Sequence, residues 1–199
     1  PWDADPAAIQ SIKPRGYILS GGPASVYAAG APHLPAFVLT GGLPVLGICY
    51  GMQVLTHALG GRVVPADERE YGAATVVPAG VNPLLPADSF QAWMSHGDRI
   101  VEMPPGFTAL AVSGNGPYAA MGDPRQGYYG LQFHPEVNHT TGGGEILRRF
   151  VCEICRCTPD WTPASIIKES IAAIRDRVGD GRLLAAVSGG VDSSVAAAL

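Results

Sequence analysis

Short runs of apolar, often β-branched residues alternate with amphipathic stretches in the first part of the chain. This pattern predicts strands over residues 17–19 and 44–48, and a helix from Met52 to Leu59 that stops at two glycines. Strands that alternate with helices are typical of parallel sheets. The pattern therefore predicts an α/β fold in which helices flank a mostly parallel sheet.

After residue 62 the apolar runs become brief and are separated by Gly, Pro and Asn. Such spacing favours an antiparallel extension of the sheet, which a helix then closes. The predicted strands are 76–77, 109–112, 118–121 and 128–133, and the predicted helix is 144–154.

A Pro-rich segment divides the chain. We predict one domain over residues 1–157, a linker over 158–163 and the start of a second α/β domain over 164–199. The elements expected in the second part are an amphipathic helix over 165–178, a strand over 183–187, a Gly-rich loop and a helix over 195–199.

Composition narrows the class of protein. Of 199 residues, 47% are hydrophobic, and the formal net charge of −4 argues against nucleic acid or a membrane surface as partner. The longest aliphatic runs, such as 183–187, fall far short of the ~20 residues that cross a bilayer. No signal peptide is visible at Pro1, so we expect a cytoplasmic protein.

The four cysteines are Cys49, Cys152, Cys155 and Cys157. They make a poor disulfide framework and fit a reducing compartment. The last three have C-x2-C-x-C spacing, but a tetrahedral zinc site would need a fourth ligand. We expect Cys152 and Cys155 to lie on one helix face as small buried side chains, with metal binding as the lesser alternative.

Residues 47–51 have the G-x-nucleophile-x-G pattern of a nucleophile elbow, with Cys49 in the nucleophile's place. The glycines on both sides allow a sharp turn between strand and helix. The N–H groups and dipole at the helix N-terminus favour a thiolate there. The pattern predicts a nucleophilic Cys49, and the alternative is a buried structural cysteine.

Two residues that could activate Cys49 follow a later strand. His134 and Glu136 are two positions apart, so at a strand end they would point to the same side. His134 can take the thiol proton and return it to a leaving amine, while Glu136 fixes the imidazole tautomer. The amides of Gly22 and Tyr50 can stabilise an oxyanion. Each feature alone is also typical of an ordinary turn, but together they favour a catalytic site.

Residues 19–23, 47–53 and 132–137 resemble the three signatures of class I glutamine amidotransferases. The resemblance covers residues 15–157 and implies that fold. It also implies a triad of Cys49, His134 and Glu136 that hydrolyses the glutamine side-chain amide through a γ-glutamyl thioester, with Gly22 and Tyr50 as oxyanion donors.

The same resemblance places a further group of residues at bound glutamine. These residues are Gln53, Ser95, His96 and Asp98. Two alternatives stay open, because Gln53 could cap a helix turn and Asp98 could begin a turn.

A second glycine-rich loop follows the predicted strand 183–187. Its glycines, its hydroxyl groups and a helix N-terminus suit it to phosphate, although it lacks the lysine of a Walker A loop. It resembles the pyrophosphate loop of N-type ATP pyrophosphatases, which implies an adenine nucleotide α-hydrolase-like domain that binds ATP, with Asp192 placing magnesium. A helix start capped by Ser or Asp is the alternative. The loop comprises Ser188, Gly189, Gly190, Val191, Asp192, Ser193 and Ser194.

A triad glutaminase ahead of such a loop resembles the glutamine-hydrolysing GMP synthase family. The resemblance implies a ligase of purine biosynthesis that aminates XMP to GMP with glutamine and MgATP through adenylyl-XMP. AMP, pyrophosphate and glutamate would be released. It further implies that the protein is a homodimer. It implies no prosthetic group, and neither nucleic acid nor a membrane as a partner. The alternatives are a stand-alone glutaminase or γ-glutamyl hydrolase, and a catalytically silent binding module.

That family has a central strand before the position of Pro1 and further nucleotide-binding and dimerisation parts after Leu199. We therefore expect an internal fragment without synthetase activity. We also expect it to fold poorly, because a missing central strand exposes unpaired edges.

Overall fold

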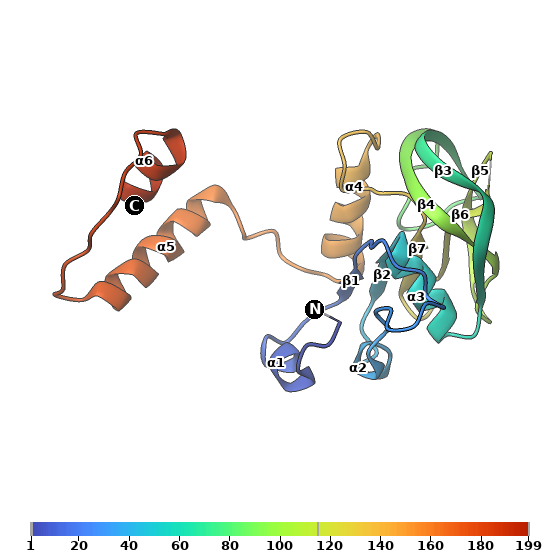
Figure 1. Ribbon diagram of the computed structural model, residues 1–199, viewed down its shortest axis with the longest axis horizontal. Coiled ribbons are helices and arrows are strands. Elements are labelled where there is room, and N and C mark those ends of the chain that lie inside the picture. The colour runs from blue at the N-terminus through green and yellow to red at the C-terminus, as the bar shows by residue number, and fades with distance from the viewer. Residues whose placement is uncertain (1, 115, 199) are drawn as a thin grey trace. The chain divides into compact units, whose positions relative to one another are not determined.

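A computed structural model describes residues 2–114 and 116–198. The chain divides into two compact units, Pro1–Cys157 and Thr158–Leu199. Figure 1 traces the elements of both units. The helices of the first unit are α1 (Pro6–Ser11), α2 (Ala36–Thr40), α3 (Tyr50–Ala58), α4 (Gly143–Arg148) and the π-helix η1 (Arg149–Ile154). Its strands are β1 (Tyr17–Leu19), β2 (Val45–Ile48), β3 (Arg62–Pro78), β4 (Phe90–Glu102), β5 (Thr108–Ser113), β6 (Gly116–Asp123) and β7 (Tyr128–Leu131).

A mixed sheet organises the first unit. Within the described residues its strands follow the order β1-β2-β7-β6-β5-β3-β4. Strands β1, β2 and β7 run parallel, with Val45 of β2 opposite Tyr17 on one side and Tyr128 on the other. The remaining neighbours are antiparallel. The α/β fold with flanking helices is thus confirmed, but the expectation of a mostly parallel sheet is wrong, because only two of the six strand pairs among the described residues are parallel. The parallel part occupies the end of the sheet that carries the nucleophile elbow.

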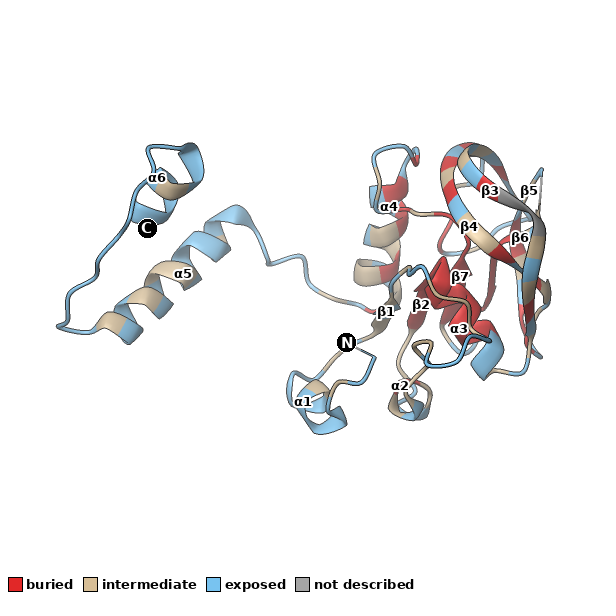
Figure 2. Cartoon of the chain, viewed as in Figure 1, coloured by how far each residue is buried: buried red, intermediate tan, exposed pale blue. Residues whose placement is uncertain are grey.

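Apolar clusters cover both faces of this sheet (Figure 2). Successive side chains of a strand point to opposite faces. Accordingly Leu46 of β2 packs in one cluster with Phe150 of η1, whereas Val45 packs in the other with Met52 and Leu55 of α3. Burying β2 between helices on both sides makes it the rigid support of the residue that follows it, Cys49.

The antiparallel part is larger than the sequence pattern predicts. Residues 76–77 form the end of the long strand β3, and β4 was not among the expected strands. In β4 the side chains of Phe90, Ala92 and Met94 point inward and alternate with more exposed ones, as expected of a strand. The alternation continues beyond Met94, but polar residues take part in it, so the hydrophobic pattern that would predict the strand is weak. Strand β3 has a register shift against β4 between Pro65 and Glu70.

The predicted helix 144–154 forms as α4, which continues into η1. Cys155 caps its end and is buried, whereas Cys152 and Cys157 are half-buried, and all four cysteines are free. Among the described residues, no cluster of three or more His, Cys, Asp or Glu is placed to hold a metal ion.

The second unit contains α5 (Pro163–Val178) and α6 (Val191–Ala198). A reciprocal capping box of Thr162 and Ser165 starts α5 at the end of the Pro-rich segment. The predicted strand over 183–187 is wrong, because these residues are irregular and Leu184 is fully exposed. A strand needs a neighbour, and the described part of this unit offers none. The predicted helix 195–199 begins earlier, at Val191, and its last residue, Leu199, lies outside the described residues. No helix in the described ranges has the length and apolarity required to span a membrane.

Candidate active site

Cys49 occupies a strained turn between β2 and α3. Its φ of 52° and ψ of −108° are unusual for a residue with a side chain. A Cβ atom on Gly47 would lie 2.5 Å from the carbonyl carbon of Gly51, and one on Gly51 would collide with the carbonyl of Leu19. Both glycines are therefore required by close backbone contact, and together they hold the elbow that presents Cys49.

The thiol of Cys49 is buried and protonated in this state. Its side chain donates a hydrogen bond to the carbonyl oxygen of Ser95 at 3.5 Å. Burial raises the pKa of the thiol to about 11; the backbone N–H of Tyr50 lowers this pKa, and the charge of Glu136 raises it further. The N–H at the start of the helix favours the thiolate as expected, but desolvation outweighs this contribution and the net pKa is raised.

His134 and Glu136 meet in the turn that follows β7. The Nδ1 atom of His134 lies 2.6 Å from Oε1 of Glu136. Strand β7 ends at Leu131, so a turn and not strand alternation brings the two side chains together. A carboxylate accepts, so Nδ1 carries the hydrogen and Nε2 is left as the acceptor. This tautomer suits a group that must take a proton from a thiol.

Thr140, which the sequence analysis missed, fixes this turn. Its hydroxyl donates to the carbonyl oxygen of His134 at 2.6 Å and accepts from the backbone N–H of Trp93 at 3.0 Å. The N–H of His134 in turn donates to the carbonyl of Trp93 at 3.0 Å. Thr140 is buried, and a threonine among turn residues carries no sequence signal of such a role. These bonds tie the His134 backbone to β4.

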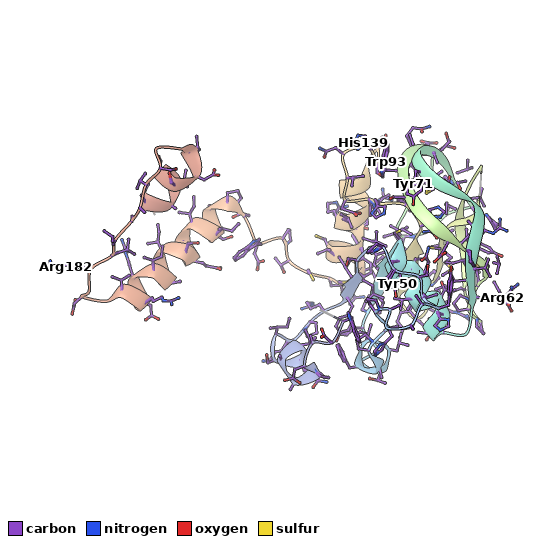
Figure 3. The ribbon with its side chains drawn as sticks, viewed as in Figure 1. Tyr50, Arg62, Tyr71, Trp93, His139 and Arg182 are labelled. Atoms are coloured by element: carbon purple, nitrogen blue, oxygen red, sulfur yellow. The ribbon has the colours of Figure 1, made fainter. Side chains whose placement is uncertain are left out.

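Trp93 of β4 also contacts His139, in the segment that follows His134. The indole of Trp93 lies at a tilt on the imidazole of His139, with ring centroids 4.6 Å apart (Figure 3). The contact adds an aromatic link between β4 and the segment that carries His134.

A pocket of about 600 Å³ opens beside Cys49. The described residues that line it include Gly22, Tyr27, Cys49, Gln53, Ser95, His96, Asp98 and His134. The loop after β1 lies against both catalytic candidates, since a Cβ on Gly21 would be 3.0 Å from Cε1 of His134 and 3.6 Å from Cβ of Cys49. The structure thus brings most of the predicted site residues around one cavity.

Asp98 is the most firmly held polar residue of the pocket wall. Its carboxylate accepts a hydrogen bond from the Tyr27 hydroxyl at 2.6 Å. Its carbonyl oxygen lies 3.2 Å from Nε2 of Gln53 and 3.0 Å from Nδ1 of His96. The two alternatives for these residues are wrong, because Asp98 lies within β4 and the Gln53 side chain reaches β4 instead of capping a turn.

The two predicted oxyanion donors belong to segments that are in contact. A Cβ on Gly22 would be 3.6 Å from the ring of Tyr50, which is the first residue of α3. The Tyr50 hydroxyl donates to the carbonyl of Pro32, so the loop after β1 is fastened to the start of α3.

In the second unit, hydroxyl groups order the loop before α6. The Ser193 hydroxyl accepts from the N–H of Ser188 at 3.2 Å and donates to the carbonyl of Gly190 at 3.1 Å. Gly189 has a φ of +84°, which glycine adopts freely. Asp192 lies in the first turn of α6. The predicted phosphate loop is therefore a compact turn at a helix N-terminus, although no strand precedes it.

Comparisons with known proteins agree with the fold and the site of the first unit. The model of the glutamine amidotransferase class-I family matches residues 1–154. The chain is 58% identical to a glutamine-hydrolyzing GMP synthase of Thermomicrobium roseum and 53% identical to one of Dehalococcoides mccartyi. Both alignments cover the whole chain but only 38% and 37% of those relatives, so the chain spans less than two fifths of their length.

A solved structure supports the same fold. A Thermoplasma acidophilum protein, assigned as one subunit of a GMP synthase, superposes with a TM-score of 0.63 at 29% identity, over 86% of this chain and 82% of that one. The matched family range contains the elbow, the loop after β1 and the His134 turn. The chain belongs to the class-I glutamine amidotransferases.

Proposed function

We propose that Cys49, His134 and Glu136 form the catalytic triad of a glutaminase. The observation that carries the proposal is that His134, which lines the same pocket as the strained Cys49, is held at 2.6 Å by Glu136. Nε2 of His134 accepts the thiol proton as Sγ of Cys49 attacks the amide carbon of glutamine. Glu136 stabilises the imidazolium that forms.

The remaining steps use the same groups. The amides of Gly22 and Tyr50 stabilise the oxyanion of the tetrahedral intermediate. His134 returns the proton to the leaving nitrogen, the C–N bond breaks, and ammonia leaves a γ-glutamyl thioester on Cys49. Water, deprotonated by His134, then attacks the thioester; the C–S bond breaks, glutamate leaves, and His134 returns the proton to the Cys49 sulfur.

This scheme agrees with a thiol whose pKa is raised. A protonated Cys49 hydrogen-bonded to Ser95 is a weak nucleophile, so near neutral pH the free site reacts only slowly with other electrophiles. Bound glutamine excludes water and brings its amide to the thiol, and proton transfer to His134 then accompanies attack. We assign Gln53, Ser95, His96 and Asp98 to the binding of glutamine, on the ground that all four line the pocket.

We further propose that the ammonia serves a GMP synthase reaction. The support is the GMP synthase relatives at up to 58% identity over the whole chain. In this reaction an oxygen of XMP attacks the α-phosphate of MgATP and releases pyrophosphate, and ammonia then displaces AMP to give GMP. The loop of residues 188–194 would bind the phosphates of ATP, with Asp192 near the magnesium of the substrate complex. We place the enzyme in the cytoplasm, as a homodimer.

One comparison of nitrogen donors tests the proposal on the full chain of the protein. Wild type and Cys49→Ala are supplied with XMP and MgATP, and with either glutamine or ammonium. We expect Cys49→Ala to lose GMP formation from glutamine and to keep it from ammonium. Glutamate release by wild type without GMP formation from either donor would instead indicate a stand-alone glutaminase. No glutamate release at all would indicate a catalytically silent binding module.

A further inference from the structure

We propose that Glu70 is a positioning residue for glutamine recognition, which acts through His96 to hold Asp98 against the α-ammonium group of the substrate. The inference rests on the proposed glutaminase function. None of the three signature motifs includes Glu70, which lies on β3.

Glu70 and His96 form a buried pair across two strands. They are directly opposed in the β3–β4 register, and Oε2 of Glu70 lies 3.1 Å from Nε2 of His96. Only 8% of the His96 side chain and 9% of the Glu70 side chain are exposed. A buried carboxylate is costly unless its partner compensates it. Each partner therefore depends on the other, because either one left alone at this depth would be uncompensated.

The register shift in β3 explains how Glu70 reaches this position. The register places Pro65 opposite Asp98 and, after the shift, Glu70 opposite His96. Irregularities of this kind redirect a side chain and are common beside active sites. Without the shift, a different residue of β3 would face His96.

The hydrogen bonds of His96 pass the effect to Asp98. A carbonyl oxygen only accepts, so the hydrogen on Nδ1 of His96 points to the carbonyl of Asp98, 3.0 Å away. The Glu70 carboxylate also only accepts, so Nε2 carries a hydrogen too and donates it to Oε2, which keeps the ring from turning to another partner. His96 and Gln53 therefore both donate to the Asp98 carbonyl oxygen and together fix the backbone there.

The consequence falls on the Asp98 carboxylate. The Tyr27 hydroxyl engages its Oδ1 atom, and the residue lines the pocket that contains Cys49. A fixed carboxylate in this wall suits the α-ammonium group of an amino acid whose amide reaches Cys49. Glu70 therefore influences the recognition of glutamine without touching it. It holds His96, and His96 holds the backbone of Asp98, whose carboxylate would contact the substrate.

The test compares two amides that differ at one group. L-Glutamine carries the α-amino group, whereas glutaramate has the same chain and amide without it. We expect Glu70→Leu, measured on the full chain, to raise KM for glutamine about tenfold with kcat changed less than about twofold. Its kcat/KM for glutaramate should equal that of wild type.

A conservative variant is the matched control. Glu70→Gln should stay within about threefold of wild type on glutamine, because its amide oxygen can accept from Nε2–H, or its NH2 can donate to a neutral Nε2, and either arrangement leaves the Nδ1 hydrogen for Asp98. Where Glu70→Leu does not fold, Glu70→Asp serves, since its shorter side chain withdraws from His96 and should impair glutamine selectively.

Three results would overturn the inference or its basis. Equal losses on both amides would show a merely structural role for Glu70. Unchanged kinetics of Glu70→Leu, or of Glu70→Asp in its place, would show no role. A wild-type chain that releases no glutamate from glutamine would refute the proposed function itself, which separates that failure from a failure at Glu70.

Discussion

Nδ1 of His134 and Oε1 of Glu136 lie 2.6 Å apart, although the two residues occupy a turn in which neither strand nor helix fixes their side chains. The turn is instead fixed from outside by the hydroxyl of Thr140. The pair is therefore pre-formed in the free protein, and His134 is held with Nε2 as its acceptor.

Replacing Glu136 tests the orientation of His134. We expect Glu136→Ala to lower kcat for glutamine hydrolysis about 100-fold and Glu136→Gln about 10-fold, because the amide oxygen can still accept from Nδ1 but carries no charge. KM should change little. Steady-state glutamate release measures both variants, and a Glu136→Ala enzyme with wild-type kcat would exclude Glu136 from the triad.

Removing the Thr140 hydroxyl tests the support behind the turn. Thr140→Val should lower the free energy of unfolding by about 1–3 kcal/mol, because the carbonyl of His134 and the N–H of Trp93 lose a buried partner. It should also lower kcat. The neighbouring exposed Thr141, changed to Val, is the matched control and should be neutral in denaturant unfolding. Equal effects of the two substitutions would contradict the assignment.

The close backbone contacts of Gly51 in the elbow predict that a larger residue cannot replace it without loss of stability. Gly51→Ala would place a Cβ against the carbonyl of Leu19, so we expect destabilisation of at least about 1–3 kcal/mol together with loss of glutaminase activity. Gly144→Ala is the control, because nothing lies within 4 Å of its Cβ and it is in a helix, where Ala is favoured by about 0.5–1 kcal/mol. Thermal unfolding distinguishes them, and a stable, active Gly51→Ala protein would refute the close contact.

The pKa of Cys49 predicts how its alkylation depends on pH. With a pKa of about 11, the thiolate fraction at pH 8 is about one part in a thousand and rises about tenfold per pH unit up to pH 10. The rate of iodoacetamide labelling at Cys49 in the free protein should follow this slope, as peptide mass spectrometry can measure. A rate that levels off near pH 8 would mean that stabilisation of the thiolate by the helix N-terminus outweighs desolvation.

Local sequence patterns correctly predict the strands and the helix that position Cys49. Residues 17–19, 45–48 and the following helix form short, continuous apolar or amphipathic segments, and G-x-C-x-G marks the turn between two of them. Here the local sequence and the buried sheet favour the same structure. The long strands β3 and β4 are harder to predict, because β3 includes Pro65 and Gly72, and inward positions of β4 include Ala92 and Asp98.

Other features depend on contacts between distant segments, which local patterns do not encode. The hydroxyl of Thr140 reaches Trp93, and Glu70 faces His96 only because of the register shift in β3. The state of the Cys49 thiol likewise depends on its burial, which a helix-terminus argument does not include. At residues 183–187 the local pattern predicts a strand that does not form. The apolar run resembles a strand, but the described part of its unit offers no neighbouring strand for it to pair with.

Covalent trapping of the nucleophile tests the central claim most directly. The protein is incubated with 6-diazo-5-oxo-L-norleucine, a glutamine analogue that alkylates the attacking thiol, and its peptides are analysed by mass spectrometry. We predict one adduct, on Cys49, that excess glutamine prevents and that His134→Asn slows strongly. An adduct on Cys152, Cys155 or Cys157, or none under conditions in which wild type releases glutamate, would contradict the assignment of Cys49 as the nucleophile.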